Sequence, residues 1–282
     1  MKKIIGNVLD KILFMNAGDA EASTKKESLK IHPVLPHGDL KEVLKNIWFV
    51  TGQVKMPMLF PPMYGSRSMT VIKNPANEEL TIVNSIRLDD EGLMKLDKIG
   101  KVANVLRIGG FHGRDDAFYR ERYNAKIFAL KGQVYTREMM KPVNDPALGY
   151  LQPDVWLNEG DLPPVPNATL KWFPGCANPE AILVIKQDGG ILVTGDSLQH
   201  TPRADMYHNW ASRILSSKFG FFKPYNIGPG WVQFAHPKLS GIRSIMELDF
   251  EHVLPGHGEA VIGGAKSKYT PAITGKIKGC HD

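Results

Sequence analysis

Apolar and β-branched residues recur along the chain in short runs, bounded by turn residues, which is typical of strands. The runs fall into two groups. The first group comprises residues 47–50, 68–73, 79–84, 102–108 and 125–130, and the second comprises residues 170–173, 181–185, 191–194 and 252–254. Asn-Pro-Ala-Asn at 74–77 and Asp-Gly-Gly at 188–190 are turn sequences between neighbouring runs.

Helical spacing occurs after strands of both groups. Residues 89–99 begin with acidic side chains and place Leu93, Leu96 and Ile99 on one face. Further helices are predicted at 116–124, near 206–217 and from Pro237 onward, and residues 139–166 are predicted to be mostly loop. Two groups of strands, each with its helices, indicate an α/β protein with two sheets face to face and helices outside.

The two ends of the chain differ from this central part. Apolar residues at positions 4–13 recur at helical spacing, and Asp10 and Lys11 interrupt them, so we predict an amphipathic helix and not a secretory signal. The predicted organisation is a helix and linker at 1–40, one domain at 41–265 and a tail at 266–282. No apolar run reaches the length of a membrane span.

Composition narrows the class of protein. The chain has 282 residues, 43% hydrophobic and 23% charged, with a net charge of +6. These values are ordinary for a globular protein, and no basic stripe with interleaved aromatic residues predicts a nucleic-acid partner. Two cysteines are too few for a disulfide framework. We expect a cytoplasmic protein that acts on a small molecule, and the oligomeric state stays open.

Two apolar strands end in tight glycine turns that each present a metal-competent side chain. Ile-Leu-Val-Thr-Gly-Asp-Ser at 191–197 presents Asp196, and Val-Leu-Pro-Gly-His-Gly at 253–258 presents His257. A strand end holds a ligand rigidly, and glycine lets the backbone turn sharply beside it. The pair in this order resembles the fourth and fifth motifs of the metallo-β-lactamase superfamily.

The resemblance extends over about residues 47–262, and it implies a four-layer αββα sandwich. The family's first motif, His-x-His-x-Asp-His, aligns with residues 111–116, so that Phe111 and Gly113 stand where the first two His would be. Asp115 keeps the Asp and Asp116 takes the place of the third His. The middle-motif His is replaced by Cys176.

The altered motifs imply that one of the family's two metal sites is lost, because phenylalanine and glycine cannot ligate a metal. The other site would use Asp115, Asp116, Asp196 and His257, with Asp115 also catalytic. This oxygen-rich set suits Mn²⁺, Fe²⁺ or Mg²⁺ at least as well as Zn²⁺. Cys176 would stand behind these ligands, and His112 would be either a substitute ligand or a residue behind them. The four ligands should approach within roughly 4–6 Å of one another, and Phe111 should fill the vacated space beside Cys176.

Each residue also has a purely structural explanation. Asp115 could cap a helix, Asp196 could stabilise its turn, and His257 could bond to a backbone carbonyl. Cys176 could be a small buried hydrophobe. We interpret Asp115, Asp196 and His257 together as a metal or polar cluster and interpret His112 and Cys176 as structural. For Asp116 the structural explanation and the metal-ligand explanation are equally favoured.

Three functions follow as hypotheses. The first is a mononuclear metal-dependent hydrolase of an ester, thioester or lactone. The second is a non-catalytic binding or scaffold protein that has kept the fold and holds no metal. The third is metal-dependent oxygenase-type chemistry at an Fe²⁺ site, although such sites more often contain several His ligands. Metal content separates the second hypothesis from the others.

Overall fold

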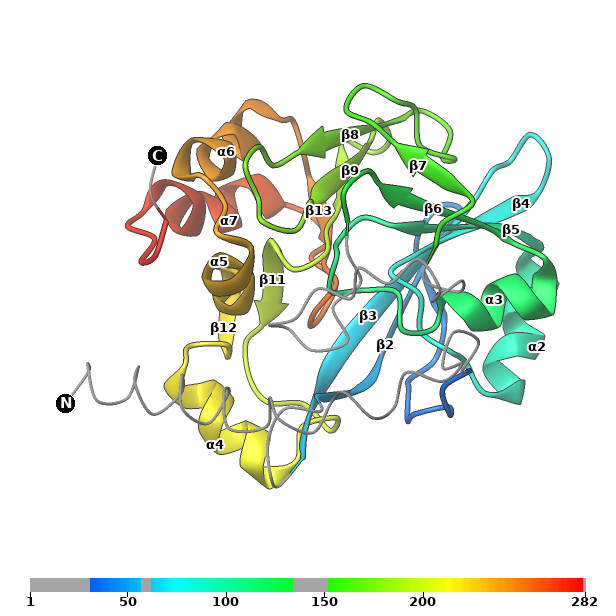
Figure 1. Cartoon of the computed structure of the whole chain (residues 1–282), viewed down its shortest axis with the longest axis horizontal. Coiled ribbons are helices and arrows are strands. Elements are labelled where there is room, and N and C mark those ends of the chain that lie inside the picture. Colours follow the sequence, from blue (N-terminus) through cyan, green and yellow to red (C-terminus); the bar gives the residue numbers. More distant parts are fainter. Residues whose placement is uncertain (1–30, 57–61, 134–151, 281–282) are drawn as a thin grey trace.

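The computed structural model describes residues 31–56, 62–133 and 152–280. The helix predicted near the N-terminus lies outside these residues. Two large sheets and their helices dominate the described part, and a small two-stranded sheet lies beside them (Figure 1).

The first sheet has seven strands in the order of the chain, from β1 to β7. Its strands are β1 (Lys41–Leu44), β2 (Ile47–Met56), β3 (Met63–Lys73), β4 (Glu79–Val83), β5 (Lys101–Arg107), β6 (Lys126–Leu130) and β7 (Val155–Leu157). β2 and β3 pair from Ile47↔Ile72 to Met56↔Met63, well beyond the predicted runs, and β7 lies in a stretch predicted to be loop.

The second sheet has four strands in the order β13-β10-β9-β8. They are β8 (Ala168–Trp172), β9 (Ala181–Ile185), β10 (Ile191–Val193) and β13 (His252–Leu254). β8, β9 and β10 are antiparallel neighbours, whereas β10 and β13 are parallel, with Val193 opposite Leu254. The turns that follow β10 and β13 therefore leave the same edge of the sheet.

Alternation along the strands divides the second sheet between two cores. Leu183, Ile191 and Val193 pack against Ile47 and Leu106 of the first sheet, which fills the space between the sheets. The opposite side chains of β9, β10 and β13 pack against the helices on the far side, as Ile182, Leu192 and Val253 do.

Helices cover both outer faces (Figure 1). α2 (Asp90–Ile99) and α3 (Asp116–Tyr123) pack on the first sheet through Leu93, Leu96, Phe118 and Tyr119. α5 (Pro229–Ala235), α6 (Leu239–Arg243), η3 (Ser244–Glu247) and α7 (Ala265–Thr274) cover the second sheet. The predicted four-layer αββα sandwich is confirmed.

Some elements differ from the sequence-based predictions. β11 (Leu198–Thr201) and β12 (Lys223–Ile227) form the small sheet, and α4 (Trp210–Lys218) lies between them in the chain. The strands were missed because they contain polar residues and a proline, and α5 was missed because it begins with Pro-Gly. Pro237 does not begin a helix, since α6 starts at Leu239.

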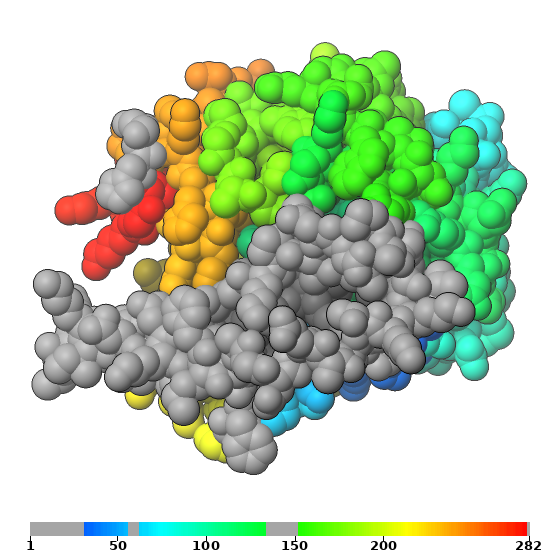
Figure 2. Space-filling view, viewed as in Figure 1, coloured from blue at the N-terminus to red at the C-terminus, as the bar shows by residue number. Residues whose placement is uncertain are grey.

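Helix α7 lies largely within the stretch set apart as a tail, and its Tyr269 and Ile273 are buried in the core of the second sheet. The domain boundaries as such stay predictions. In the space-filling view, the segments around β7–β9 (green) and α6 (orange) form the upper part of the surface (Figure 2). Within the described residues, no helix is both long and apolar enough to cross a membrane.

Candidate metal centre

The turns after β10 and β13 bring Asp196 and His257 together. His257 Nε2 lies 2.9 Å from Asp196 Oδ1. The amide of Gly256 donates to the carbonyl of Gly195 at 3.2 Å, so the two turns are also joined through their backbones. The predicted placement of Asp196 and His257 at one edge of the sheet is confirmed.

Glycine is required in the turn that carries His257. A Cβ at Gly256 would lie 2.5 Å from the carbonyl oxygen of Gly195 and 3.0 Å from His112 Cε1. Gly258 has φ +90, a left-handed conformation, and a Cβ there would overlap the carbonyl of His200. The Gly-His-Gly sequence thus lets the backbone of this turn pass close to its neighbours.

His112 completes the cluster. Its Nε2 lies 3.2 Å from Asp196 Oδ2, and its ring centroid lies 5.4 Å from that of His257. One ligand atom from each of His112, Asp196 and His257 lies within 4.8 Å of the others. His112, which the sequence analysis interpreted as structural, therefore belongs to the group of residues that could hold a metal.

The hydrogen bonds of His257 determine which ring nitrogen carries the proton and which one faces Asp196. Its Nδ1 lies 2.7 Å from the carbonyl oxygen of Ser66, which can only accept, so Nδ1 carries a proton. Nε2 is left to face Asp196. A histidine held in this way presents one defined nitrogen to a metal.

The electrostatics of the three residues are coupled. Burial raises the pKa of Asp196, but the charges and hydrogen bonds of His112 and His257 outweigh it and hold this pKa well below its usual range. Burial lowers the pKa of His257, but the hydrogen bond and charge of Asp196 raise it by more, so its net pKa is raised. Burial dominates at His112 and lowers its pKa. Asp196 is therefore ionised and His112 is neutral at neutral pH.

Three buried atoms of this cluster have no hydrogen-bond partner. They are both ring nitrogens of His112 and Oδ2 of Asp196. His112 Nε2 and Asp196 Oδ2 are close without hydrogen-bond geometry. Leaving buried polar atoms unpaired costs stability, and a cation shared by His112 Nε2 and Asp196 Oδ2 would satisfy these two atoms. The donor set thus fits a divalent metal ion.

Asp115 lies in a different electrostatic setting. In the part of the chain that the structure describes, the metal-competent group does not include Asp115. Its Oδ2 accepts from Arg67 Nη2 at 2.6 Å and from the amide of Arg87 at 3.1 Å, and its Oδ1 accepts from Arg114 Nη1 at 2.7 Å. Asp115 also stands at the N-cap position of α3 without a side-chain capping bond. Two guanidinium groups thus neutralise this carboxylate.

Among the described residues, Asp116 is likewise outside the metal-competent group, and its carboxylate contacts Ser85 and Arg107. Its Oδ1 accepts from Ser85 Oγ at 2.6 Å, and its Oδ2 lies 3.5 Å from Arg107 Nη1. Gly113 has φ +114, and a Cβ there would lie 2.8 Å from Arg107 Cδ and Nη1. The buried Arg107–Asp116 pair therefore occupies the space that a side chain at position 113 would need.

The turn after β4, formed by Asn84 and Ser85, is hydrogen-bonded to residues that surround the candidate metal centre. Asn84 Nδ2 donates to the carbonyl of Thr194 at 3.0 Å, and Ser85 supplies both the Asp116 bond and a carbonyl that accepts from Arg67 at 2.7 Å. This Asn-Ser turn connects the two arginine–aspartate pairs to the strand that precedes Asp196.

Phe111 and Cys176 lie against the same core, and the prediction that Phe111 fills the space beside Cys176 stays a prediction. Both are partly buried and lie against the core of the second sheet. Burial, with the nearby charge of Glu180 second, raises the pKa of the Cys176 thiol to about 12. Cys176 is therefore a protonated thiol at neutral pH and a poor metal ligand.

Glu180 is a buried acid that the sequence analysis did not single out. Its Oε1 accepts from the amide of Ser197 at 2.7 Å, and its Oε2 has no hydrogen-bond partner. A Cβ at either Gly109 or Gly195 would lie 3.3 Å from this carboxyl group. Burial and the charge of Asp196 raise the pKa of Glu180 to about 8. In the sequence, a glutamate between Pro179 and an apolar strand does not indicate that its side chain is buried or that its pKa is raised.

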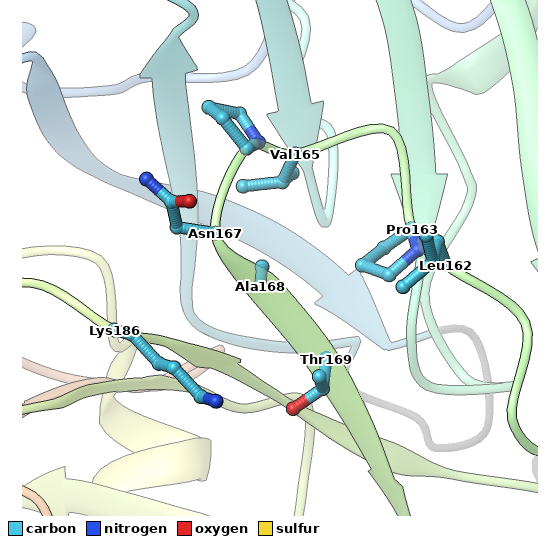
Figure 3. Close-up of a pocket in the computed structure, with 8 residues that line it drawn as sticks. Leu162, Pro163, Val165, Asn167, Ala168, Thr169 and Lys186 are labelled. Atoms are coloured by element: carbon cyan, nitrogen blue, oxygen red, sulfur yellow. The ribbon is translucent and has the colours of Figure 1, made fainter.

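A pocket of about 510 Å³ lies elsewhere, lined by residues of the 162–169 segment and by Lys186 (Figure 3). Ala168 is opposite Ile185, and Ile185 is opposite Ile191, so the pocket borders the edge where β10 begins. The metal-competent cluster follows the other ends of β10 and β13. The pocket is therefore separate from the candidate metal centre.

Comparison with known proteins identifies the fold. No protein-family model and no curated protein sequence matches the chain. Among solved structures, the DIM-1 metallo-β-lactamase is similar, with a TM-score of 0.54, 12% identity, and coverage of 86% of this chain and 98% of the other. The metallo-β-lactamase IND-7 also has a TM-score of 0.54, with 10% identity and coverage of 86% and 100%. At these identities the likeness shows the fold alone.

Proposed function

We propose that this chain, which has the metallo-β-lactamase fold, holds one divalent metal ion at His112, Asp196 and His257 and acts as a metal-dependent hydrolase. Its proposed substrates are small molecules with an ester, thioester or lactone bond. The observation that carries the proposal is that one ligand atom from each of His112, Asp196 and His257 lies within 4.8 Å of the others, while buried ligand atoms of His112 and Asp196 have no hydrogen-bond partner.

The number and kind of ligands support a catalytic ion. Catalytic zinc sites use three protein ligands and leave one position open. Two imidazoles and one carboxylate match that arrangement. The ligand role predicted for Asp115 and Asp116 stays a prediction, and their pairing with arginine favours His112 over them as the third ligand.

The chain's own residues would set the charge of the site and hold the proton of His257 in place. A bound ion would polarise a substrate oxygen and activate water. Asp196 supplies a permanent negative charge, while the Ser66 carbonyl holds the proton of His257 on Nδ1. Asp115 neutralises Arg67, whose charge would otherwise oppose a cation near the two histidines.

The same donor set favours a second candidate. Two His and one carboxylate with open positions is the usual ligand set of non-haem Fe²⁺ oxygenases. Oxygenase chemistry had little support while His257 was the only His among the predicted ligands. With His112 in the cluster, this function follows if the protein carries iron and consumes oxygen. Zinc or manganese in the protein would favour hydrolysis.

Metal analysis with thermal denaturation tests the proposal. Protein prepared without added metal should contain close to one divalent ion, or should show a rise in Tm with Zn²⁺, Fe²⁺, Mn²⁺ or Mg²⁺, because a ligand of the folded state stabilises it. Asp196→Asn and His112→Gln should each abolish the rise. Asp249→Asn, at an almost fully exposed carboxylate, is the matched control and should leave it unchanged.

The negative result is equally definite. A chain that carries no metal and shows no rise in Tm with any of the four ions is not a metal-dependent hydrolase. The non-catalytic alternative would then replace the proposal, with His112, Asp196 and His257 as a polar cluster inside a binding or scaffold protein.

A further inference from the structure

Helix α4 (Trp210–Lys218) buries three small side chains and exposes two large apolar ones. Ala211, Ser212 and Ser216 are buried, whereas Trp210 is 66% exposed and Ile214 is 51% exposed. A surface helix normally turns its apolar face to the core. Packing within this chain therefore does not account for Trp210 and Ile214.

The segments on either side of α4 enlarge the exposed apolar surface. Met206 is 83% exposed and Phe219 is 38% exposed. We call Met206, Trp210, Ile214 and Phe219 the α4 patch. Figure 1 shows α4 (yellow) projecting at the lower edge of the molecule, away from the helices that cover the second sheet.

The segment that carries the α4 patch has charged residues of one sign. Residues 206–246 contain no Asp or Glu. Arg213, Lys218 and Lys223 are exposed beside the patch. Asp205, just before it, lies 2.7 Å from His208 Nδ1 and accepts from it. An apolar patch with a basic border is complementary to a surface that has an apolar interior and anionic groups on its outside.

We propose that the α4 patch docks the protein on an anionic lipid surface. Trp210 and Ile214 would enter the boundary between headgroups and acyl chains, and Arg213, Lys218 and Lys223 would lie against the lipid phosphates. A stable protein interface needs roughly 20–30 residues on each side, far more than this short helix offers. A few inserted side chains with basic neighbours are enough for reversible lipid binding.

The α4 segment is tied to the strand that supports the candidate metal centre. Gln53 Nε2 donates to the carbonyl of Tyr207 at 3.0 Å, and Asn209 Nδ2 donates to the carbonyl of Pro62 at 2.8 Å, just before β3. Ser66 of β3 in turn accepts from His257. Docking through α4 would place the protein on the lipid through an element fixed to the rigid sheet.

Vesicle co-sedimentation of the full chain tests the proposal. The protein should bind vesicles of phosphatidylcholine mixed with phosphatidylglycerol and should bind pure phosphatidylcholine far less, with binding that weakens as salt rises. Trp210→Ser with Ile214→Ser should reduce binding at least about tenfold, because two large apolar side chains no longer insert. Lys218→Gln with Lys223→Gln should reduce binding only to the anionic vesicles.

A matched control separates the α4 patch from apolar exposure in general. Trp156→Ser with Met94→Ser removes side chains of similar size that are 39% and 57% exposed on β7 and α2, and it should leave binding unchanged. Unaltered binding by the Trp210→Ser, Ile214→Ser variant overturns the proposal, as does failure of the parent chain to bind anionic vesicles. A dimer that dissociates in this variant, without lipid binding, would assign the patch to a second copy of the chain.

Discussion

The Asp115 carboxylate is held by the guanidinium of Arg67, with Oδ2 and Nη2 2.6 Å apart and both side chains buried. The carboxylate that the family motif assigns to a metal is thus neutralised by a cation of the chain itself. Because Arg67 is fixed on β3, this charge is present whether or not a metal binds. The pair therefore contributes to the stability of the fold whether or not the candidate metal centre is occupied.

Asp115→Asn should destabilise the fold, and it should weaken metal binding without abolishing it, because Arg67 is left unneutralised near the two histidines. Removing one partner of a buried ion pair leaves the other charge uncompensated and costs about 3–5 kcal/mol, measured by urea unfolding. Asp97→Asn, which breaks the half-exposed pair with Arg122, is the control and should cost far less. A folded Asp115→Asn protein that has lost its metal-induced rise in Tm would instead make Asp115 a ligand.

Glu180→Gln should change how stability depends on pH in protein treated with a chelator. The pKa of Glu180 is raised from 4.5 to about 8 by burial and by Asp196. The stabilisation from its proton is complete below the unfolded pKa and is lost as pH rises through about 8. Glutamine mimics the protonated form at every pH.

The advantage of Glu180→Gln over the parent chain should therefore grow between pH 5 and pH 9. Each unit of pKa shift corresponds to about 1.4 kcal/mol, so the change should be on the order of a few kcal/mol. Urea unfolding at each pH measures it. Parallel pH profiles of the two proteins would show that Glu180 is ionised throughout this range.

Gly113→Ala should destabilise the chain by more than backbone strain alone. The left-handed conformation of Gly113 costs a non-glycine residue about 1–3 kcal/mol, and a Cβ would also press on Arg107. Gly160→Ala is the matched control, because Gly160 has φ +93 and nothing lies within 4 Å of its Cβ position. Equal losses in urea unfolding would mean that Arg107 moves aside freely.

Cys176 should react slowly with iodoacetamide at pH 8. Its pKa of about 12 leaves little thiolate, so alkylation should be at least about a hundredfold slower than for an ordinary thiol. A Cys280→Ser background restricts the reaction to Cys176, and the same protein unfolded in urea supplies the ordinary rate. Fast alkylation of the folded protein would contradict the burial of this thiol.

The predictable parts of the protein were those set by local pattern. Strand runs and glycine turns are local features, and they identified the layers, Asp196 and His257. Turn geometry decides the role of His112, because the bond from its amide to the Gly109 carbonyl turns the chain there. Sequence spacing alone does not show which side chain of Phe-His-Gly faces Asp196.

The surroundings of Asp115 and Asp116 depend on residues far away in the chain. Arg67 and Arg107 lie on separate strands, and an arginine within an apolar strand could face either side of the sheet. Only the pairing of β3, β4 and β5 shows that both guanidinium groups turn inward toward these carboxylates. Motif alignment singled out the two aspartates as ligands but could not reveal their arginine partners.

The parallel pairing of β10 with β13 also dictates when the centre can form. Asp196 and His257 are separated by 61 positions, and the intervening chain forms both strands of the small sheet, α4, α5 and α6. Contacts so distant in sequence form slowly, because a long loop must close first. During synthesis, the three ligands cannot meet until β13 has emerged and docked beside β10. Capture of an ion by the proposed centre would therefore be a late event in folding, and it would lock a sandwich that is already assembled.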